Sequence, residues 1–185
     1  MRIFGEMWIP FLIGLLIVTS PFILFKIHSD YKMKAELSKP GFVLSYIFYS
    51  LFGMAIVNAA LHSKLVFSPG DIPYGIIGNI FMVAGGVIIA EAFFEFRSIK
   101  RINGLKADKV ISTGIYRFSR NPQLIGYHLF LIGFSLPYRS ILAIILILIH
   151  LIIMNFIFVS GEEKFLEKSL GDEYARYKKR TRRWL

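Results

Sequence analysis

Two polar stretches in the C-terminal half of the chain carry the side chains best suited to chemistry. The first, "STGIYRFSRNPQL" (residues 112–124), directly precedes an apolar run. Asn121 and Pro122 are typical of a helix start, where asparagine caps well and the missing N–H of proline costs nothing. A helix start alone does not require Tyr116, Arg117 and Arg120. Free N–H groups beside arginines would also receive an anion, such as a carboxylate or a phosphate.

The second stretch, "SGEEKFLEKSLG" (residues 160–171), contains two adjacent carboxylates. Glu162 and Glu163 lie where the last apolar run ends, next to loops that are otherwise basic. A single glutamate there would be an ordinary solvated helix residue, whereas an adjacent pair favours a functional role. Gly171 predicts a helix end, and Asp172 predicts the cap of the next helical segment.

Two further segments could contribute to the same site. In "EAFFEF", Glu91 and Glu95 share a helix face, and Glu91 falls within an apolar run, where a carboxylate is a functional candidate by default. The alternative is that both glutamates reach the headgroup level and pair with Arg97 or Arg101. The tail "DEYARYKKRTRRWL" has six basic residues among its last eleven and no acid there. This pattern predicts an interfacial segment held to anionic headgroups, which could also close a pocket.

The elements that must position these residues are membrane helices. The chain has 185 residues, of which 55% are hydrophobic, and its mean hydropathy is +0.58. Apolar runs at 7–25, 41–61, 74–94 and 140–160 match the bilayer thickness. A shorter run, 124–136, predicts a hairpin with the next helix, turning at residues 137–139. The basic segment after the first run has no small-residue cleavage site, so that run is interpreted as a span and not as a signal peptide.

These runs predict an all-α fold, a multi-pass transmembrane helical bundle with five membrane segments, the last two forming a helical hairpin. We expect a single membrane domain over 1–185, with three spans in 1–96 and the candidate site in 97–185. Basic loops at 26–39, 97–120 and 161–185 alternate with nearly neutral ones. The positive-inside rule therefore places the N-terminus outside and the C-terminus and the site in the cytoplasm.

The same charge pattern limits the possible partners. The net charge of +10 predicts attraction to anionic membrane lipids, whereas nucleic-acid binding is disfavoured because spans separate the basic residues. The absence of cysteine excludes disulfides, thiolate catalysis and cysteine-bound zinc. The histidines at 28, 62, 128 and 150 have no metal-ligand spacing, so no metal is expected.

In their order and spacing, the segments "GIYRFSRNPQLIG", "EEKFLE" and "GDEYARYKKRTRRW" resemble the isoprenylcysteine carboxyl methyltransferase family, within the wider group that includes phospholipid methyltransferases. The resemblance covers about residues 105–185. It implies a helical bundle whose C-terminal segments enclose S-adenosylmethionine. Arg180 or Arg183 resembles the tail arginine associated with the acceptor carboxylate. Asn121 and Leu124 replace the usual histidine and tyrosine of the pattern. The implied cofactor-pocket residues are Tyr116, Arg120, Asn121, Pro122, Glu162 and Glu163.

The acceptor stays open at this level. A carboxylate acceptor needs no general base and would be positioned by an arginine. A lipid amine must lose a proton, for which Glu91 or one of the paired glutamates is the candidate. The number of arginines and the missing histidine favour an acid or another acceptor that is already nucleophilic, and isoprenylcysteine-type carboxyl O-methylation is the first choice. The alternatives are N-methylation of a phospholipid or another amine, a membrane sterol reductase that uses NADPH, and a non-catalytic membrane protein.

Overall fold

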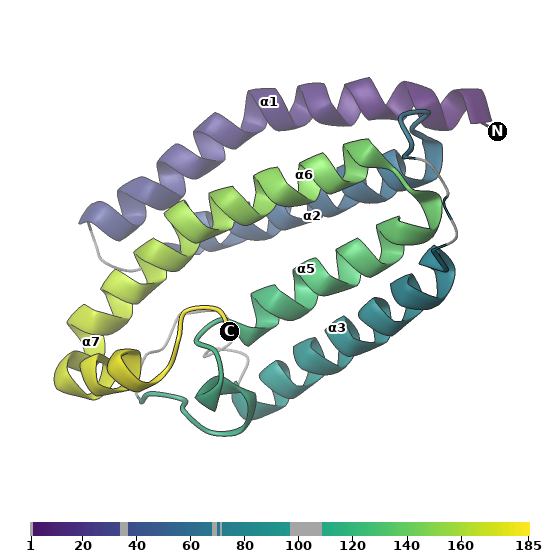
Figure 1. Cartoon of the computed structure of the whole chain (residues 1–185). Helices are drawn as coiled ribbons and strands as arrows, with labels where there is room; N and C mark the ends of the chain where they lie inside the picture. Colours follow the sequence, from purple (N-terminus) through teal and green to yellow (C-terminus); the bar gives the residue numbers. More distant parts are fainter. Residues whose placement is uncertain (1, 34–36, 68–69, 71, 97–108) are drawn as a thin grey trace.

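The computed structural model describes residues 2–33, 37–67, 70, 72–96 and 109–185 (Figure 1). Within these ranges the fold is all-α, and the only extended pairing consists of two isolated bridges. The elements are α1 (Arg2–Met33), α2 (Lys39–His62), α3 (Tyr74–Phe96), η1 (Gly114–Arg117), α5 (Pro122–Ser135), η2 (Leu136–Tyr138), α6 (Ile141–Ile153), the π-helical turn η3 (Met154–Val159) and α7 (Ser160–Arg180).

Four of the described helices are long and apolar enough to cross a membrane: α1, α2, α3 and the continuous helix formed by α6, η3 and α7. The 14-residue α5 is too short to cross a membrane. The chain turns back through η2 into α6, so the expected hairpin is present. Arg139 closes the turn with a φ of 55°. The all-α bundle of about five membrane helices is therefore confirmed, and the chain is a multi-pass integral membrane protein.

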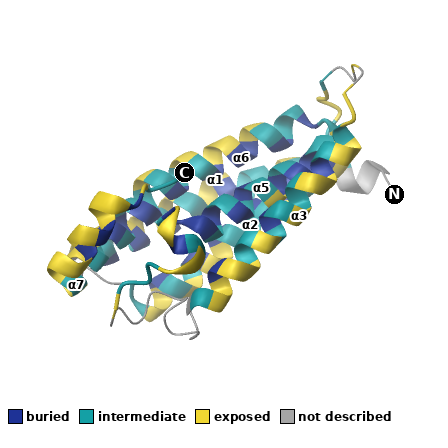
Figure 2. Cartoon of the chain, turned by 60° about the horizontal axis from the view of Figure 1, so that its bottom comes forward, coloured by how far each residue is buried: buried dark blue, intermediate teal, exposed yellow. Residues whose placement is uncertain are grey.

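The outer surface of the bundle is apolar, as a bilayer requires. Buried residues line the contacts between helices, whereas many outward-facing positions are exposed (Figure 2). Phe22 and Phe94, for example, are 75% and 76% exposed, which would be costly in water but not in lipid.

Glycines hold α5 against α3, the closest helix pair of the bundle. A Cβ added to Gly85 would lie 2.6 Å from the Gly126 carbonyl oxygen, and one added to Gly78 would lie 2.6 Å from that of Gly133. The two backbones can approach this closely only because both partners lack a side chain, a common way to pack helices in membranes. This packing fixes the start of α5, where the first polar stretch lies, beside the end of α3.

At the same end of the bundle, a polar contact joins α1 to α2. The buried carboxylate of Asp30 binds Lys26 and both the hydroxyl and the backbone N–H of Ser38. The Ser38 hydroxyl in turn accepts from the Gly41 N–H at 3.2 Å and caps α2. From this contact, α1 and α2 lie side by side for most of their length (Figure 1).

Two irregular points occur in the last helix before the chain ends. The π-helical turn η3 precedes the glutamate pair, and Gly171, at φ 51° and ψ −126°, separates two helical segments within α7. The break that the sequence predicted at Gly171 is thus present. After Arg180 the chain is no longer helical, and residues 181–185 run back along the start of α5 (Figure 1).

Candidate active site

The most concentrated group of charges in the described chain joins the two polar stretches. The buried carboxylate of Glu163 lies between two guanidinium groups. Arg120 donates to Oε1 from Nη2 at 2.7 Å and from Nε at 3.0 Å. Arg183 donates to Oε2 from Nη2 at 2.5 Å and to Oε1 from Nε at 3.2 Å. A carboxylate held by two arginines in this way is fully neutralised.

The tail is bound through its backbone by residues 119–121. The Arg120 N–H donates to the Arg182 carbonyl at 2.9 Å, and its Nη1 donates to the Thr181 carbonyl at 2.6 Å. The Arg183 carbonyl accepts from the Asn121 amide at 3.0 Å and from the Ser119 hydroxyl at 3.2 Å. Three successive carbonyls of the tail are therefore satisfied by three successive residues of the first polar stretch.

This arrangement assigns Asn121 a role other than capping. It occupies the cap position of α5, but its side chain makes no capping hydrogen bond, and its amide is directed to the tail. Pro122 follows at the first helical position and is fully buried. The helix-start interpretation therefore accounts for Pro122, whereas Asn121 serves mainly as a donor to the tail backbone.

Two tyrosines connect the same segments from the other side. Tyr177 of α7 donates its hydroxyl to the Tyr116 carbonyl at 2.7 Å, and the Tyr116 hydroxyl donates to Gln123 Oε1 at 2.9 Å. Burial raises the pKa of the Tyr116 phenol well above its ordinary value, and the charge of Glu162 raises it further. Tyr116 therefore remains a protonated hydroxyl beside the carboxylates.

Glu162 differs from its neighbour because its carboxylate has no hydrogen bond or ion pair with any residue that the structure describes. It lies on the wall of a cavity of about 340 Å³ enclosed by α1, α2, α3, α5 and the last helix. Other wall residues include Tyr31, Tyr46, Tyr49 and Tyr127. A single unpaired carboxylate among aromatic rings makes this cavity suited to a positively charged ligand.

The structure brings together most of the residues that the sequence singled out. Glu91 does not join them, because its side chain is exposed on α3. Arg180 is also exposed, with its guanidinium carbon 5.9 Å from the centre of the Tyr177 ring. Glu95 accepts a hydrogen bond from the Thr113 hydroxyl at 2.7 Å, and its expected partners Arg97 and Arg101 lie outside the described residues. The residues at the site are Tyr116, Arg120, Asn121, Pro122, Glu162, Glu163 and Arg183.

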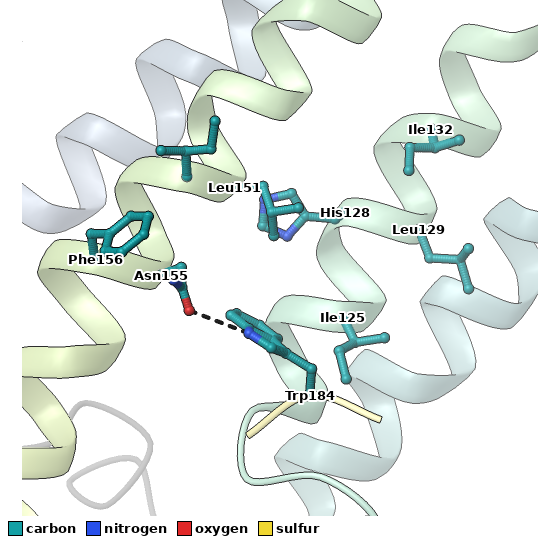
Figure 3. A pocket seen from close by; sticks show the side chains of 9 residues that line it. Ile125, His128, Leu129, Ile132, Leu151, Asn155, Phe156 and Trp184 are labelled. Carbon is teal, nitrogen blue, oxygen red and sulfur yellow. Dashed lines mark hydrogen bonds between the residues drawn. The ribbon is translucent and has the colours of Figure 1, made fainter. Parts of the chain in front are cut away.

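Sequence reasoning missed Asn155, which ties the tail to the last helix. Its Oδ1 accepts from the Trp184 indole at 3.2 Å (Figure 3). It also accepts from Arg183 Nη1 at 3.4 Å. The available signal was an amide within the apolar run "LIIMNFIF", since a polar group at membrane depth usually has a specific partner. Asn155 lies in the π-helical turn, and such turns are frequent at functional sites.

Sequence reasoning also missed the contact between His128 and His150. They are 22 residues apart in sequence, but Nε2 of His128 lies 3.0 Å from Nδ1 of His150, both side chains being buried. Among the described residues, no group of three or more histidine, cysteine, aspartate or glutamate side chains is placed to hold a metal ion. The pair bridges α5 and α6.

A second cavity lies beside α5 and α6 (Figure 3). This outer groove, of about 510 Å³, is lined mainly by apolar side chains of α5 and the last helix, together with His128, Asn155 and Trp184. None of its lining residues also lines the Glu162 cavity. It is therefore a separate feature, bounded at one end by the tail.

Comparison with known proteins identifies the group to which this architecture belongs. Residues 74–173, more than half of the chain, match the model of the phospholipid methyltransferase family. An uncharacterized protein of Haemophilus influenzae is 39% identical over 57 residues, which is 31% of this chain and 90% of that protein. No solved structure shows a significant match. The matched region runs from α3 to the second segment of α7 and contains the glutamate pair and the first polar stretch, so the chain belongs to the phospholipid methyltransferase family.

Proposed function

We propose that the chain transfers a methyl group from S-adenosylmethionine to an amine carried by a membrane lipid, at the end of the bundle where α7 lies. The observation that carries the proposal is the unpaired Glu162 carboxylate on the wall of the aromatic cavity. The family match supports methyl transfer by a membrane enzyme, and the choice of acceptor is argued from the charges of the site.

The residues present fit the cofactor. S-adenosylmethionine carries positive charge on its sulfonium and amino groups, and Glu162 with its neighbouring tyrosine rings can compensate such charge. Glu162 and Tyr116 are the residues we expect to hold it, with Arg120, Asn121 and Pro122 beside the cavity and Glu163 positioning Arg120. When bound, the cofactor supplies a methyl group already activated for displacement.

The charge of Glu162 favours an amine over a carboxylate acceptor. When an amine is methylated, one positive charge stays in the cavity, where Glu162 balances it and can receive the proton that the methylated amine releases. A carboxylate acceptor would add a second negative charge beside Glu162. After transfer to a carboxylate, the positive charge of the sulfonium is lost, and the amino group of the spent cofactor alone would remain to balance Glu162.

The described arginines lead to the same choice. An acceptor carboxylate needs a guanidinium free to pair with it. Arg120 and Arg183 are both occupied by Glu163, and Arg180 is exposed over the Tyr177 ring. Isoprenylcysteine-type O-methylation, which the number of arginines favoured, therefore lacks a free guanidinium in Arg120 and Arg183, the two arginines at the site.

We further propose that this end of the bundle faces the cytoplasm and contacts anionic lipids. The positive-inside rule supports that orientation, since the basic loops lie there. Lys179, Arg180 and Arg182 are exposed near the tail, where they can attract anionic headgroups.

A binding and turnover experiment tests the function. The purified protein in lipid nanodiscs should bind S-adenosylmethionine and not NADPH, measured by calorimetry, and should methylate phosphatidylethanolamine rather than farnesylcysteine. Glu162→Gln should weaken cofactor binding about tenfold or more, since a charge-assisted hydrogen bond is worth about 1.5–3 kcal/mol. Glu167→Gln is the matched control, because Glu167 is exposed on the same helix and pairs with Lys178. Equal cofactor affinity in both variants, or preferred methylation of farnesylcysteine, would contradict the proposal.

A further inference from the structure

We infer that the hydrocarbon chain of the acceptor lipid lies in an apolar groove between α1 and α2 that adjoins the Glu162 cavity at Tyr49 and Tyr127. The inference rests on the proposed function, and it names the path of the substrate. The groove, hereafter the α1–α2 groove, has a volume of about 920 Å³.

The two spaces adjoin each other because they share wall residues. Tyr49 and Tyr127 line both the Glu162 cavity and the α1–α2 groove. Their rings meet edge to face, with centroids 5.8 Å apart at an interplanar angle of 87°, and the Tyr127 hydroxyl lies 3.4 Å from the Tyr49 carbonyl oxygen. These two side chains therefore separate a polar chamber from an apolar one.

The α1–α2 groove has the dimensions and chemistry of a site for a lipid chain. Both of its walls are helices that can cross a membrane. From Tyr49 to Leu61 it follows α2 for about 18 Å, at 1.5 Å per residue, which is more than half of a hydrocarbon core of about 30 Å. Its lining from α1 includes Trp8, Phe11 and Leu15. Burial of methylene groups against such side chains is favourable.

The charge of the Glu162 cavity at one end of the α1–α2 groove indicates which class of ligand binds there. The chamber end carries the unpaired Glu162, and the groove end is lined mainly by apolar side chains. A molecule that matches both is a long hydrocarbon chain with a positively charged head. An amine-bearing lipid has this form, whereas an acidic lipid would place its negative charge against Glu162.

The outer groove between α5 and α6 is the competing path, and its geometry is less suitable. It shares no lining residue with the Glu162 cavity. Its polar end consists of Asn155 and the Trp184 indole, which are hydrogen-bonded to each other (Figure 3). A chain bound there would leave its headgroup outside the tail and away from Glu162.

Gly53 is a position at which an added side chain would narrow the α1–α2 groove. It lies on α2 in the groove wall, and an added Cβ would meet only the Tyr127 hydroxyl, at an ordinary contact distance of 3.4 Å. Replacement of a helical glycine by leucine also favours the helix. Met54, which is 54% exposed in the same wall, offers a second position.

The test compares single-chain ethanolamine phospholipids with long and short acyl chains. In nanodiscs, Gly53→Leu and Met54→Trp should each raise KM for the long-chain lipid about tenfold, since the loss of about two buried methylene contacts has that effect. KM for the short-chain lipid and kcat for both should stay unchanged. Leu129→Trp in the outer groove is the control and should alter neither KM. Equal changes for both chain lengths, or a chain-length effect in Leu129→Trp alone, would overturn the inference.

A binding readout separates this inference from the proposed function. A long-chain ethanolamine phospholipid with a photoreactive diazirine at the chain end should label residues 8–15 or 54–61. Labelling of residues 125–132 or 151–156, or of no part of the chain, would overturn the proposed path. Label in α1 and α2 without any methyl transfer would instead contradict the proposed function and leave the lipid site in place.

Discussion

The side-chain amide of Asn121 donates a hydrogen bond to the backbone carbonyl of Arg183 at 3.0 Å, although 62 residues separate the two in the sequence. Together with Arg120 and Ser119, Asn121 holds residues 181–183 against the start of α5. The C-terminal tail is therefore a wall of the candidate site, and the stretch that precedes α5 binds the tail in place.

The Asn121 contact predicts an order of effects that capping would not give. Asn121→Asp should release the tail, because a carboxylate cannot donate to a carbonyl, and Asn121→Ser should do the same because its hydroxyl is too short. Asn121→His keeps an N–H donor and should be tolerated better than either. Limited proteolysis of the C-terminus, followed by mass spectrometry, measures the release. Since Asp and Ser cap as well as Asn, unchanged protection in both variants would mean that the residue acts only as a cap.

The ion pairs of Glu163 with Arg120 and Arg183 predict a large loss of folding stability when the Glu163 carboxylate is removed. Glu163→Gln leaves the mostly buried Arg120 guanidinium without its counter-ion, and breaking a buried pair in this way costs on the order of 3 kcal/mol. The Glu167–Lys178 pair has both side chains about two-fifths exposed, so Glu167→Gln should cost less than about 1 kcal/mol. Thermal unfolding in detergent compares the two, and similar melting temperatures would contradict the assignment.

Arg120→Lys gives a second test of the same group. Arg120 donates to the Glu163 carboxylate and to two tail carbonyls at once, and lysine cannot reproduce this planar set of contacts. We expect weakened cofactor binding and a more protease-sensitive tail in a protein that still folds. Arg117→Lys is the control, since Arg117 is exposed and contacts the Phe118 ring. Identical behaviour of the two variants would show that the hydrogen bonds of the Arg120 guanidinium are not needed for cofactor binding or for holding the tail.

The glycine contacts between α3 and α5 predict a steric effect on folding. Gly85→Ile would place a branched side chain against the backbone of α5, where a Cβ alone would already be 2.6 Å from the Gly126 carbonyl and the Phe130 nitrogen. The helices would have to separate, and the site at the start of α5 would be lost. Gly86→Ile is the control, because nothing lies within 4 Å of a Cβ at that position. The yield of monodisperse protein from detergent reports the difference.

Orientation is tested by accessibility. The chain has no cysteine, so single-cysteine replacements at Lys64 and Lys178 can be labelled in intact cells. Lys64 pairs with Glu6 near the start of α1, at the opposite end of the bundle from Lys178. We expect an impermeant maleimide to label position 64 and not position 178. The same prediction places Lys34 and Lys106 in the cytoplasm, although both lie outside the described residues. Labelling of both tested positions from the same side would refute the topology.

The sequence by itself determined the helical framework and the polar segments. An apolar run of about 20 residues is a local property, and in a bilayer it can satisfy its backbone groups only as a helix. The turn at residues 137–139 and the break at Gly171 follow from local chemistry in the same way. The proximity of residues 116–122 to Glu162 and Glu163 also follows, since one hairpin returns both segments to the same end.

Only the tertiary structure decided which partner each polar group has. Glu162 and Glu163 are adjacent and chemically identical, but the rotation of α7 turns one to two arginines and leaves the other in the cavity. The fold also directed Asn121 to the tail and placed Glu91 on the exposed face of α3. Helix rotation and the path of the tail depend on packing over the whole bundle, such as the glycine contacts of α3 with α5. No short segment of sequence contains that information.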